Sequence, residues 1–195
     1  MNYFISTGEL SGDLHASYIV EKIKNLDKNA KVYAIGGMNL KKQDVEIVRD
    51  IDSLAIMGFV EVVKNFNFLK KVLEETVEFI LSNNIDRVVL VDYGGFNLKL
   101  LERLKLKKPS LKITYYIPPK VWIWGKKRVP KIAKADEILV IFPWEVDFYK
   151  KENVKALYFG NPFMEKYEKI TKKGDNILLL PGSRKQEITK LLPIM

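Results

Sequence analysis

Residues 87–97, Arg-Val-Val-Leu-Val-Asp-Tyr-Gly-Gly-Phe-Asn, are the stretch that decides the fold. Its first part, Arg87–Val91, is rich in β-branched residues and apolar without alternation, as expected of a central parallel strand buried on both faces. Asp92 and two glycines follow where this strand ends, and Asn97–Lys105 has the pattern of a helix. A strand, a turn and a helix in this order form the repeating unit of a parallel α/β sheet.

The same alternation continues on both sides of this unit. Further strands are predicted at Tyr3–Ser6, Lys31–Ile35, Val45–Val48, Lys112–Ile117, Glu137–Phe142 and Ala156–Phe159. Further helices are predicted at Asp13–Lys24, Phe66–Leu81, Lys126–Ala135 and Trp144–Lys151. We therefore predict an α/β fold, a doubly wound parallel-sheet, Rossmann-like domain.

The pattern changes after Pro162, which suggests a domain boundary. Residues 1–162 form the predicted domain, and residues 163–175 are polar and lysine-rich, as expected of a linker. Residues 176–195 hold a predicted strand, Asn176–Leu180, a Pro-Gly-Ser-Arg turn and a predicted helix, Lys185–Leu192. One strand and one helix cannot bury their apolar faces alone, so we expect this segment to be the truncated start of a second α/β domain.

Composition and charge limit the kinds of functional site and partner that the chain can have. The 195 residues include no cysteine, which excludes disulfides, thiolate metal sites and cysteine nucleophiles. No signal peptide is expected, and the longest nearly uncharged apolar run, Leu54–Val63, has about half of the ~20 residues that span a bilayer. Of the net charge of +9, residues 99–134 carry 12 Lys/Arg against one Glu, a net of +11. This stretch predicts an anionic partner, with a solvated lysine-rich face as the alternative.

The loop after the first strand, Thr7–Asp13, lies where ligands of open parallel sheets bind. Gly8 and Gly12 allow the backbone to approach a ligand closely, and the next helix offers free N–H groups. The spacing is not that of a dinucleotide loop, and the carboxylates of Glu9 and Asp13 disfavour a pyrophosphate. Either a loop that contacts a sugar or an amine, or a simple helix cap, fits this pattern.

Asp92 stands at the carboxyl end of the central strand, and the glycines after it leave room for a substrate. A carboxylate in this place can act as a general base that accepts a proton from an attacking hydroxyl. A turn and helix-cap aspartate is the alternative interpretation.

The segment Tyr115–Arg128 joins two prolines, two tryptophans and a basic run. Trp122 and Trp124 flank one apolar position, and the cations of residues 126–128 begin a predicted helix, where the macrodipole disfavours them unless an anion is near. This placement favours a phosphate site over a solvated face. The tryptophans could also stack on bases, but no RRM, KH or OB pattern accompanies them.

Large apolar residues concentrate around a single Glu in residues 54–69, with lysines at the border. A buried core helix and a surface that contacts a membrane both fit this composition.

Taken in order, five segments resemble motifs of the lipid-A-disaccharide synthase family, inverting glycosyltransferases of the GT-B architecture. They are Gly8–Asp13 (Gly-Glu-x-Ser-Gly-Asp), Leu54–Val62 (Leu-Ala-x-Met-Gly-x-Val-Glu-Val), Asp92–Asn97 (Asp-x-x-x-Phe-Asn), Pro119–Arg128 (Pro-x-Val-Trp-x-Trp with a basic tail) and Leu179–Arg184 (Leu-Leu-Pro-Gly-Ser-Arg). They extend over essentially the whole chain in the family's order, which makes the resemblance specific.

The resemblance implies the N-terminal half of a GT-B fold, followed by the first βα unit of a second Rossmann-like domain. It implies transfer of a diacylated glucosamine from UDP to the 6-hydroxyl of diacylglucosamine 1-phosphate, with release of UDP. No cofactor beyond the UDP-sugar donor and no metal are expected, since this class stabilises the leaving diphosphate with helix dipoles and side chains. The implied partners are the UDP-linked donor, the acylated glucosamine phosphate and an anionic membrane surface, with no nucleic acid. A cytoplasmic protein, peripheral on the inner membrane, is expected, and a homodimer stays open.

The resemblance also implies roles for single residues. Asp92 looks like the general base, and Glu9 looks like a second functionally important acid. Substrate contacts are implied for Gly8, Ser11, Gly12, Asp13, Asn97, Lys120, Trp122, Trp124, Lys127, Arg128 and Arg184. Membrane contacts are implied for Met57, Phe59, Val60, Val63, Phe66 and Leu69.

The chain departs from the family pattern at three positions. Gly95 replaces a second aspartate, and Pro118 and Lys120 replace serines before the tryptophans. Family members are much longer than this chain, so we expect it not to turn over alone and to bind lipid better than UDP. The alternatives are another GT-B enzyme, such as a peptidoglycan glucosaminyltransferase or a UDP-sugar epimerase, and a non-catalytic module that binds anionic lipid or nucleic acid.

Overall fold

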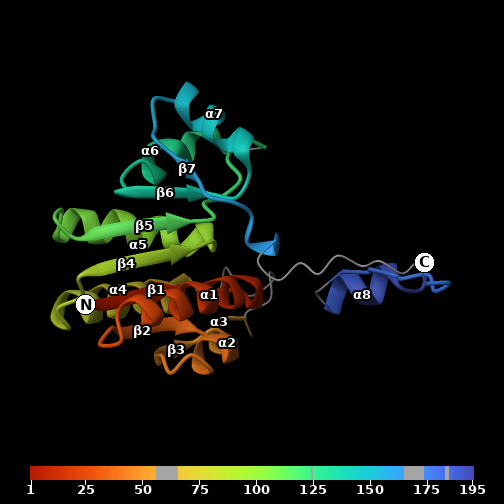
Figure 1. Cartoon of the computed structure of the whole chain (residues 1–195), viewed down its shortest axis with the longest axis horizontal. Coiled ribbons are helices and arrows are strands. Elements are labelled where there is room, and N and C mark those ends of the chain that lie inside the picture. The colour runs from red at the N-terminus through yellow and green to blue at the C-terminus, as the bar shows by residue number, and fades with distance from the viewer. Residues whose placement is uncertain (56–65, 124, 165–173, 183–184) are drawn as a thin grey trace. The chain divides into compact units, whose positions relative to one another are not determined.

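Seven strands, all paired in parallel, form one sheet in the order β3-β2-β1-β4-β5-β6-β7 (Figure 1). The computed structural model describes residues 1–55, 66–123, 125–164, 174–182 and 185–195. The strands are β1 Asn2–Ser6, β2 Lys31–Gly36, β3 Glu46–Asp50, β4 Arg87–Val91, β5 Lys112–Tyr116, β6 Glu137–Val140 and β7 Leu157–Tyr158. The predicted α/β class and the parallel, doubly wound sheet are confirmed.

Helices connect the strands. They are α1 Leu10–Leu26, α2 Met38–Lys41, α3 Asp52–Ala55, α4 Phe66–Ser82, α5 Gly94–Lys107, α6 Val129–Ile132, α7 Pro143–Lys151 and α8 Lys185–Leu191, with 3-10 turns η1 Lys126–Arg128 and η2 Pro162–Met164. The helix predicted over Lys126–Ala135 is wrong in extent, because Gly125 in a left-handed conformation leads into η1 and only four residues of α6 follow. The short helices α2 and α3 are additions to the prediction.

The sheet is buried on both faces, and strand alternation decides which side chain goes where. Val88 and Leu90 of β4 belong to one core cluster, with residues of α4 and α5. Val89 and Val91 belong to the other cluster, with residues of α1. Successive strand residues point to opposite faces, so a continuous apolar run such as β4 fills both layers at once.

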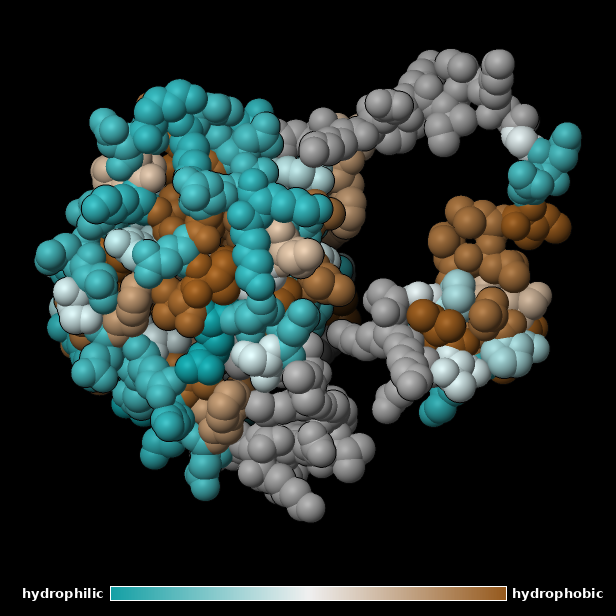
Figure 2. All heavy atoms as spheres, turned by 90° about the horizontal axis from the view of Figure 1, so that it is seen from below, coloured by the Kyte–Doolittle hydropathy of each residue, from teal (hydrophilic) through white to brown (hydrophobic). Residues whose placement is uncertain are grey.

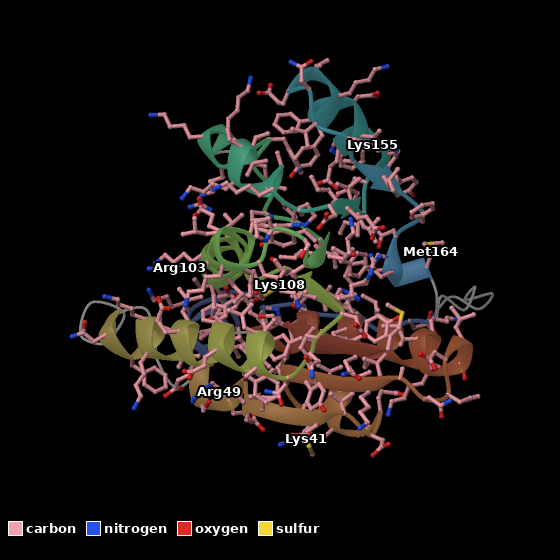
Figure 3. All side chains as sticks on the ribbon, turned by 90° about the vertical axis from the view of Figure 1, so that its left-hand side faces the viewer. Lys41, Arg49, Arg103, Lys108, Lys155 and Met164 are labelled. Atoms are coloured by element: carbon pink, nitrogen blue, oxygen red, sulfur yellow. The ribbon has the colours of Figure 1, made fainter. Side chains whose placement is uncertain are left out.

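Ion pairs link the long helix α4 to β3 and α5. Arg49 at the end of β3 reaches Glu75 at 2.7 Å, and Arg103 on α5 reaches Glu74 at 3.4 Å. Figure 3 shows these two arginines on opposite sides of α4. The pairs are partly exposed, so each adds little stability.

The chain divides into two compact units, Met1–Met164 and Glu165–Met195. In the smaller unit the strand predicted at Asn176–Leu180 is not formed, since these residues pair with no strand in the part of the chain that the structure describes. Apolar side chains of this unit are exposed, among them Ile177 at 89% and Leu180 at 75%, and they dominate its surface in Figure 2. A single strand without a partner cannot satisfy its backbone by a ladder, which explains the missing strand.

Candidate functional site

The strand order reverses direction between β1 and β4, the two neighbours at the centre of the sheet. Ligands of open α/β sheets bind beyond the carboxyl ends of the strands at this switch point. Ser6 ends β1 and Val91 ends β4, so the loops that begin with Thr7 and Asp92 lie next to each other. The arrowheads in Figure 1 mark this edge of the sheet.

Close backbone packing at this edge depends on two glycines. A Cβ on Gly8 would lie 2.4 Å from the ring of Tyr93, and one on Gly12 would lie 2.2 Å from Oγ1 of Thr7. Real Cβ atoms do not approach other atoms this closely, so a larger residue at either position would force Tyr93 or Thr7 to shift. Gly8 and Gly12 are buried, whereas Glu9 and Ser11 between them are exposed at the mouth of the switch point.

Asp92 and Tyr93 both have a φ of +48°, in the left-handed region that non-glycine residues rarely adopt. The carbonyl oxygen of Asp92 accepts hydrogen bonds from the Asn97 amide at 2.9 Å and from the Tyr115 hydroxyl at 3.1 Å. The Asp92 N–H donates to Tyr116 at 3.0 Å. The surrounding structure therefore holds an unfavourable backbone conformation, a pattern that gathers at active sites.

The Asp92 carboxyl is electrostatically unusual. Burial raises its pKa above the ordinary value, and the negative charge of Glu9 raises it further. The Tyr93 N–H and the charge of Lys120 lower the pKa but do not reverse the shift. Burial and Glu9 also raise the pKa of the Tyr93 hydroxyl. A half-buried carboxylate with a raised pKa is a stronger proton acceptor than an exposed aspartate.

Asn97 is completely buried, and its predicted substrate contact stays a prediction. Its amide nitrogen donates to the carbonyls of Ser6, Val91 and Asp92, at 3.1, 3.3 and 2.9 Å. Its side-chain oxygen accepts from the Ser6 hydroxyl at 2.6 Å. All its hydrogen-bonding atoms are thus used to tie the end of β1 to the end of β4.

Asp13 is also completely buried. Its two oxygens accept from the backbone N–H groups of Gly37 at 2.6 Å and Asn39 at 2.8 Å. These groups begin α2, so Asp13 fastens the first turn of α1 to the β2–α2 turn. Both Asp13 oxygens thus have internal partners, and the predicted substrate contact of Asp13 stays a prediction.

The loop after β5 reaches back to the switch point. Ile117 has a φ of +56°, and Pro119 fills the space in front of Gly94, where a Cβ would lie 2.4 Å from its ring. Lys120 follows, and its charge acts on the Asp92 carboxyl. Lys127 and Arg128 lie in η1 beyond this loop. Because α6 is only four residues long, the expected macrodipole effect on these cations is small.

Trp122 is anchored by a residue that sequence reasoning missed. Its indole N–H donates to Glu145 at 3.0 Å, and the other Glu145 oxygen accepts from the N–H groups of Ile141 at 3.2 Å and Phe142 at 3.0 Å. Glu145 is 3% exposed and closes the first turn of α7. A proline at the helix start with Glu two residues later is a capping signal that the sequence contained.

Six of the predicted site residues lie outside the described part of the chain, whereas two of the predicted membrane contacts lie on α4. Leu69 is half-buried on α4, and Phe66 begins that helix. The residues outside the description are Met57, Phe59, Val60, Val63, Trp124 and Arg184. Among the described residues, no helix is long and apolar enough to cross a membrane.

Known proteins resemble this chain along nearly all its length. The sequence model described as lipid-A-disaccharide synthetase matches residues 3–195. A lipid-A-disaccharide synthase of Coxiella burnetii is 33% identical over 96% of this chain and 53% of its own length. That of Persephonella marina is 36% identical over 98% of this chain and 53% of its own length. The chain thus spans about half the length of the curated relatives it matches.

Solved structures share the fold at low identity. The UDP-GlcNAc 2-epimerase of Neisseria meningitidis, bound to UDP-GlcNAc, has a TM-score of 0.60 at 10% identity over 83% of this chain and 46% of its own. MurG of Acinetobacter baumannii has a TM-score of 0.52 at 13% identity over 88% of this chain and 47% of its own. These two structures support the GT-B architecture and nothing finer. By its sequence match over residues 3–195, the chain belongs to the lipid-A-disaccharide synthetase family.

Proposed function

We propose that this chain forms the acceptor side of an enzyme that makes the lipid A disaccharide. The donor is UDP-2,3-diacylglucosamine, and the acceptor is 2,3-diacylglucosamine 1-phosphate. The observation that carries the proposal is the Asp92 carboxyl, held with a raised pKa at the β1/β4 switch point of a chain that matches this family over residues 3–195.

In the proposed reaction Asp92 acts as the general base. Its carboxylate takes the proton of the acceptor 6-hydroxyl while the hydroxyl oxygen attacks C1 of the donor glucosamine. A new C1–oxygen bond forms, the bond from C1 to the UDP oxygen breaks, and UDP leaves with the bonding electrons. Attack from the face opposite UDP inverts the configuration at C1. The raised pKa of Asp92 helps this step, because the carboxylate binds the proton more strongly.

Glu9 is the second proposed catalytic residue, and it acts through its charge. A carboxylate next to another carboxylate disfavours ionisation of its neighbour, as the effect of Glu9 on the Asp92 pKa indicates. Lys120 opposes this effect and offers a cation for the acceptor phosphate. The remaining substrate contacts are proposed for Gly8, Ser11, Gly12, Trp122, Trp124, Lys127, Arg128 and Arg184.

We further propose that three segments of the chain have different functions. Residues 1–162 act as the acceptor and membrane-side domain, residues 163–175 as the linker, and residues 176–195 as the start of the domain that binds the UDP donor. The separate compact unit Glu165–Met195 and its exposed apolar side chains support this division. The residues proposed for membrane contact are Met57, Phe59, Val60, Val63, Phe66 and Leu69, on the cytoplasmic face of the inner membrane.

The test is turnover of the two acylated monosaccharides by the protein that the complete reading frame encodes. Asp92→Asn keeps the shape of the side chain but removes the base, so we expect the turnover rate to fall by about 10²–10⁴-fold while acceptor binding changes little. Asp147→Asn, the same change at an exposed position of α7, is the matched control. Normal turnover in Asp92→Asn would remove Asp92 as the base.

A further inference from the structure

An exposed cluster of large apolar side chains lies where the loops after β5 and β6 meet. We call Trp122, Ile123, Phe142 and Trp144 the aromatic patch. Ile123 is 59% exposed, Trp144 51% and Trp122 36%. Large apolar side chains gathered on a surface in this way mark a contact with another molecule or with a membrane.

The rings of the aromatic patch are held in place without being buried. Phe142 and Trp144 stack with centroids 4.4 Å apart and planes 13° apart. Trp122 meets Trp144 edge-on at 6.3 Å and 85°. The buried Glu145 carboxylate holds both Trp122 and Phe142 in place. One of its oxygens accepts from the Trp122 indole N–H, and the other accepts from the Phe142 backbone N–H. The patch is therefore preorganised, and binding through it requires little further ordering.

Lysines lie beside the patch, although Lys126 is paired with Glu152 at 2.6 Å. The Lys120 ammonium lies 6.0 Å from the centroid of the Phe142 ring. Lys126 and Lys127 follow directly in η1, and both are exposed. Two of the patch residues, Trp122 and Ile123, belong to the stretch of residues 99–134, which carries 12 basic residues and one acidic residue. Charge complementarity selects an anionic partner rather than a neutral one.

Tryptophan beside lysine is the pairing that membrane–water interfaces favour. Indole rings settle at the level of the lipid headgroups, and lysines nearby are attracted to anionic lipids. We propose that the aromatic patch inserts into the headgroup region of an anionic bilayer and forms a membrane contact of its own, separate from the residues of the 57–69 segment.

The position of the patch relates it to the reacting site. Pro119 packs against Gly94 and Lys120 acts on the Asp92 carboxyl, so the loop that carries the patch also borders the switch point. A bilayer contact here would bring a lipid acceptor close to Asp92. In this respect the inference rests on the proposed function, but membrane binding is measured without sugar transfer.

The three tryptophans of the sequence, Trp122, Trp124 and Trp144, provide the readout. The 195-residue chain is mixed with vesicles of phosphatidylcholine alone or with phosphatidylglycerol, and tryptophan emission is recorded with and without brominated phosphatidylcholine. We expect a blue shift and bromine quenching only with phosphatidylglycerol present, and weaker binding as salt is added.

Ile123→Ser is the variant that tests the patch, because it removes an exposed apolar side chain and leaves every tryptophan in place. We expect it to weaken partitioning into the anionic vesicles by about tenfold. Leu106→Ser is the matched control, since Leu106 is 77% exposed on α5 within the same basic stretch and we expect no change there. A Met57→Ser variant, measured in the same way, tests the membrane contact proposed for the 57–69 segment.

Three results would overturn the inference. The first is vesicle binding without any quenching of the tryptophans. The second is an Ile123→Ser variant that binds like Leu106→Ser while Met57→Ser loses binding. The third is a dimer in sedimentation that Ile123→Ser dissociates, without vesicle binding, because the patch would then be a contact between copies. None of these results touches the role of Asp92, and a loss of turnover in Asp92→Asn would not support the patch.

Discussion

The first turn of α1 and the loop between β4 and α5 lie at the same switch point, yet the fold uses their aspartates in opposite ways. Asp13 in α1 is completely buried and both of its oxygens bond to backbone N–H groups. Asp92 after β4 keeps its carboxyl partly exposed, with a pKa raised by burial and by Glu9. A carboxylate with two internal donors supports the fold, whereas one held beside another negative charge is available for chemistry.

Asn97 joins the two regions, and its loss is expected to have the largest effect on stability. Asn97→Leu leaves the carbonyls of Ser6, Val91 and Asp92 without their shared donor. We expect the free energy of unfolding to fall by about 3–5 kcal/mol, because unpaired buried polar groups are costly. Urea unfolding followed by circular dichroism measures it, with the exposed Asn67→Leu as control. A loss as small as in that control would contradict the bridging role.

Asp13→Ala is expected to have the second largest effect. The N–H groups of Gly37 and Asn39 would lose their acceptors, so the free energy of unfolding should fall by about 2–4 kcal/mol. Asp13→Asn retains one acceptor oxygen and should recover part of this loss. The same unfolding experiment on Asp147→Ala, an exposed site, serves as reference. If Asp13→Ala unfolds like the reference, Asp13 does not support the fold.

Two glycines offer a matched pair at the starts of α1 and α5. A methyl group on Gly12 would collide with Thr7, whereas one on Gly95 would meet nothing within 4 Å. Gly12→Ala should therefore destabilise by about 1–3 kcal/mol. Gly95→Ala should stabilise by about 0.5–1 kcal/mol, since alanine favours a helix over glycine. Equal effects of the two changes on the urea midpoint would argue against close packing at the first turn of α1.

Asp92→Asn should have the smallest effect on stability, and its sign depends on pH. A raised pKa means that the folded state holds the Asp92 proton more tightly than the unfolded state does. This contribution is present below the unfolded pKa and is lost as pH rises through the folded pKa. Wild type should therefore lose stability relative to Asp92→Asn between pH 3 and neutral pH, roughly the range in which a raised aspartate titrates. The opposite slope in urea unfolding would mean that the folded state favours the ionised carboxylate.

The strands were predictable because their signals are local. Arg87–Val91 agrees with β4 at both ends, since a short run rich in β-branched residues between turn signals favours a strand. The helices α2 and α3 have four residues each, too few to show a helical period. Asn176–Leu180 has an apolar run like that of β4, but a run becomes a strand only where another strand pairs with it.

The site was only partly predictable. The position of Asp92 followed from the rule that ligands bind at the carboxyl ends of parallel strands. The burial of Asn97 and Asp13 did not follow, because it depends on which neighbouring strand or turn each side chain meets. Their partners Ser6 and Gly37 lie 91 and 24 residues away in the chain. Glu145 had a capping signal, yet its bond to Trp122 across 23 residues had none.

The most direct test of Asp92 as the base is the pKa of its carboxyl, measured by carbon NMR of the side chain in wild type and in Glu9→Gln. We expect a pKa above the ordinary 3.8 in wild type and a lower one in Glu9→Gln, because the neighbouring charge is gone. Asp27, whose pKa is lowered through its hydrogen bond to the N-terminal ammonium, should titrate identically in both proteins. An Asp92 pKa at or below the ordinary value, unmoved by Glu9→Gln, would contradict the central claim that Asp92 is the base at the switch point.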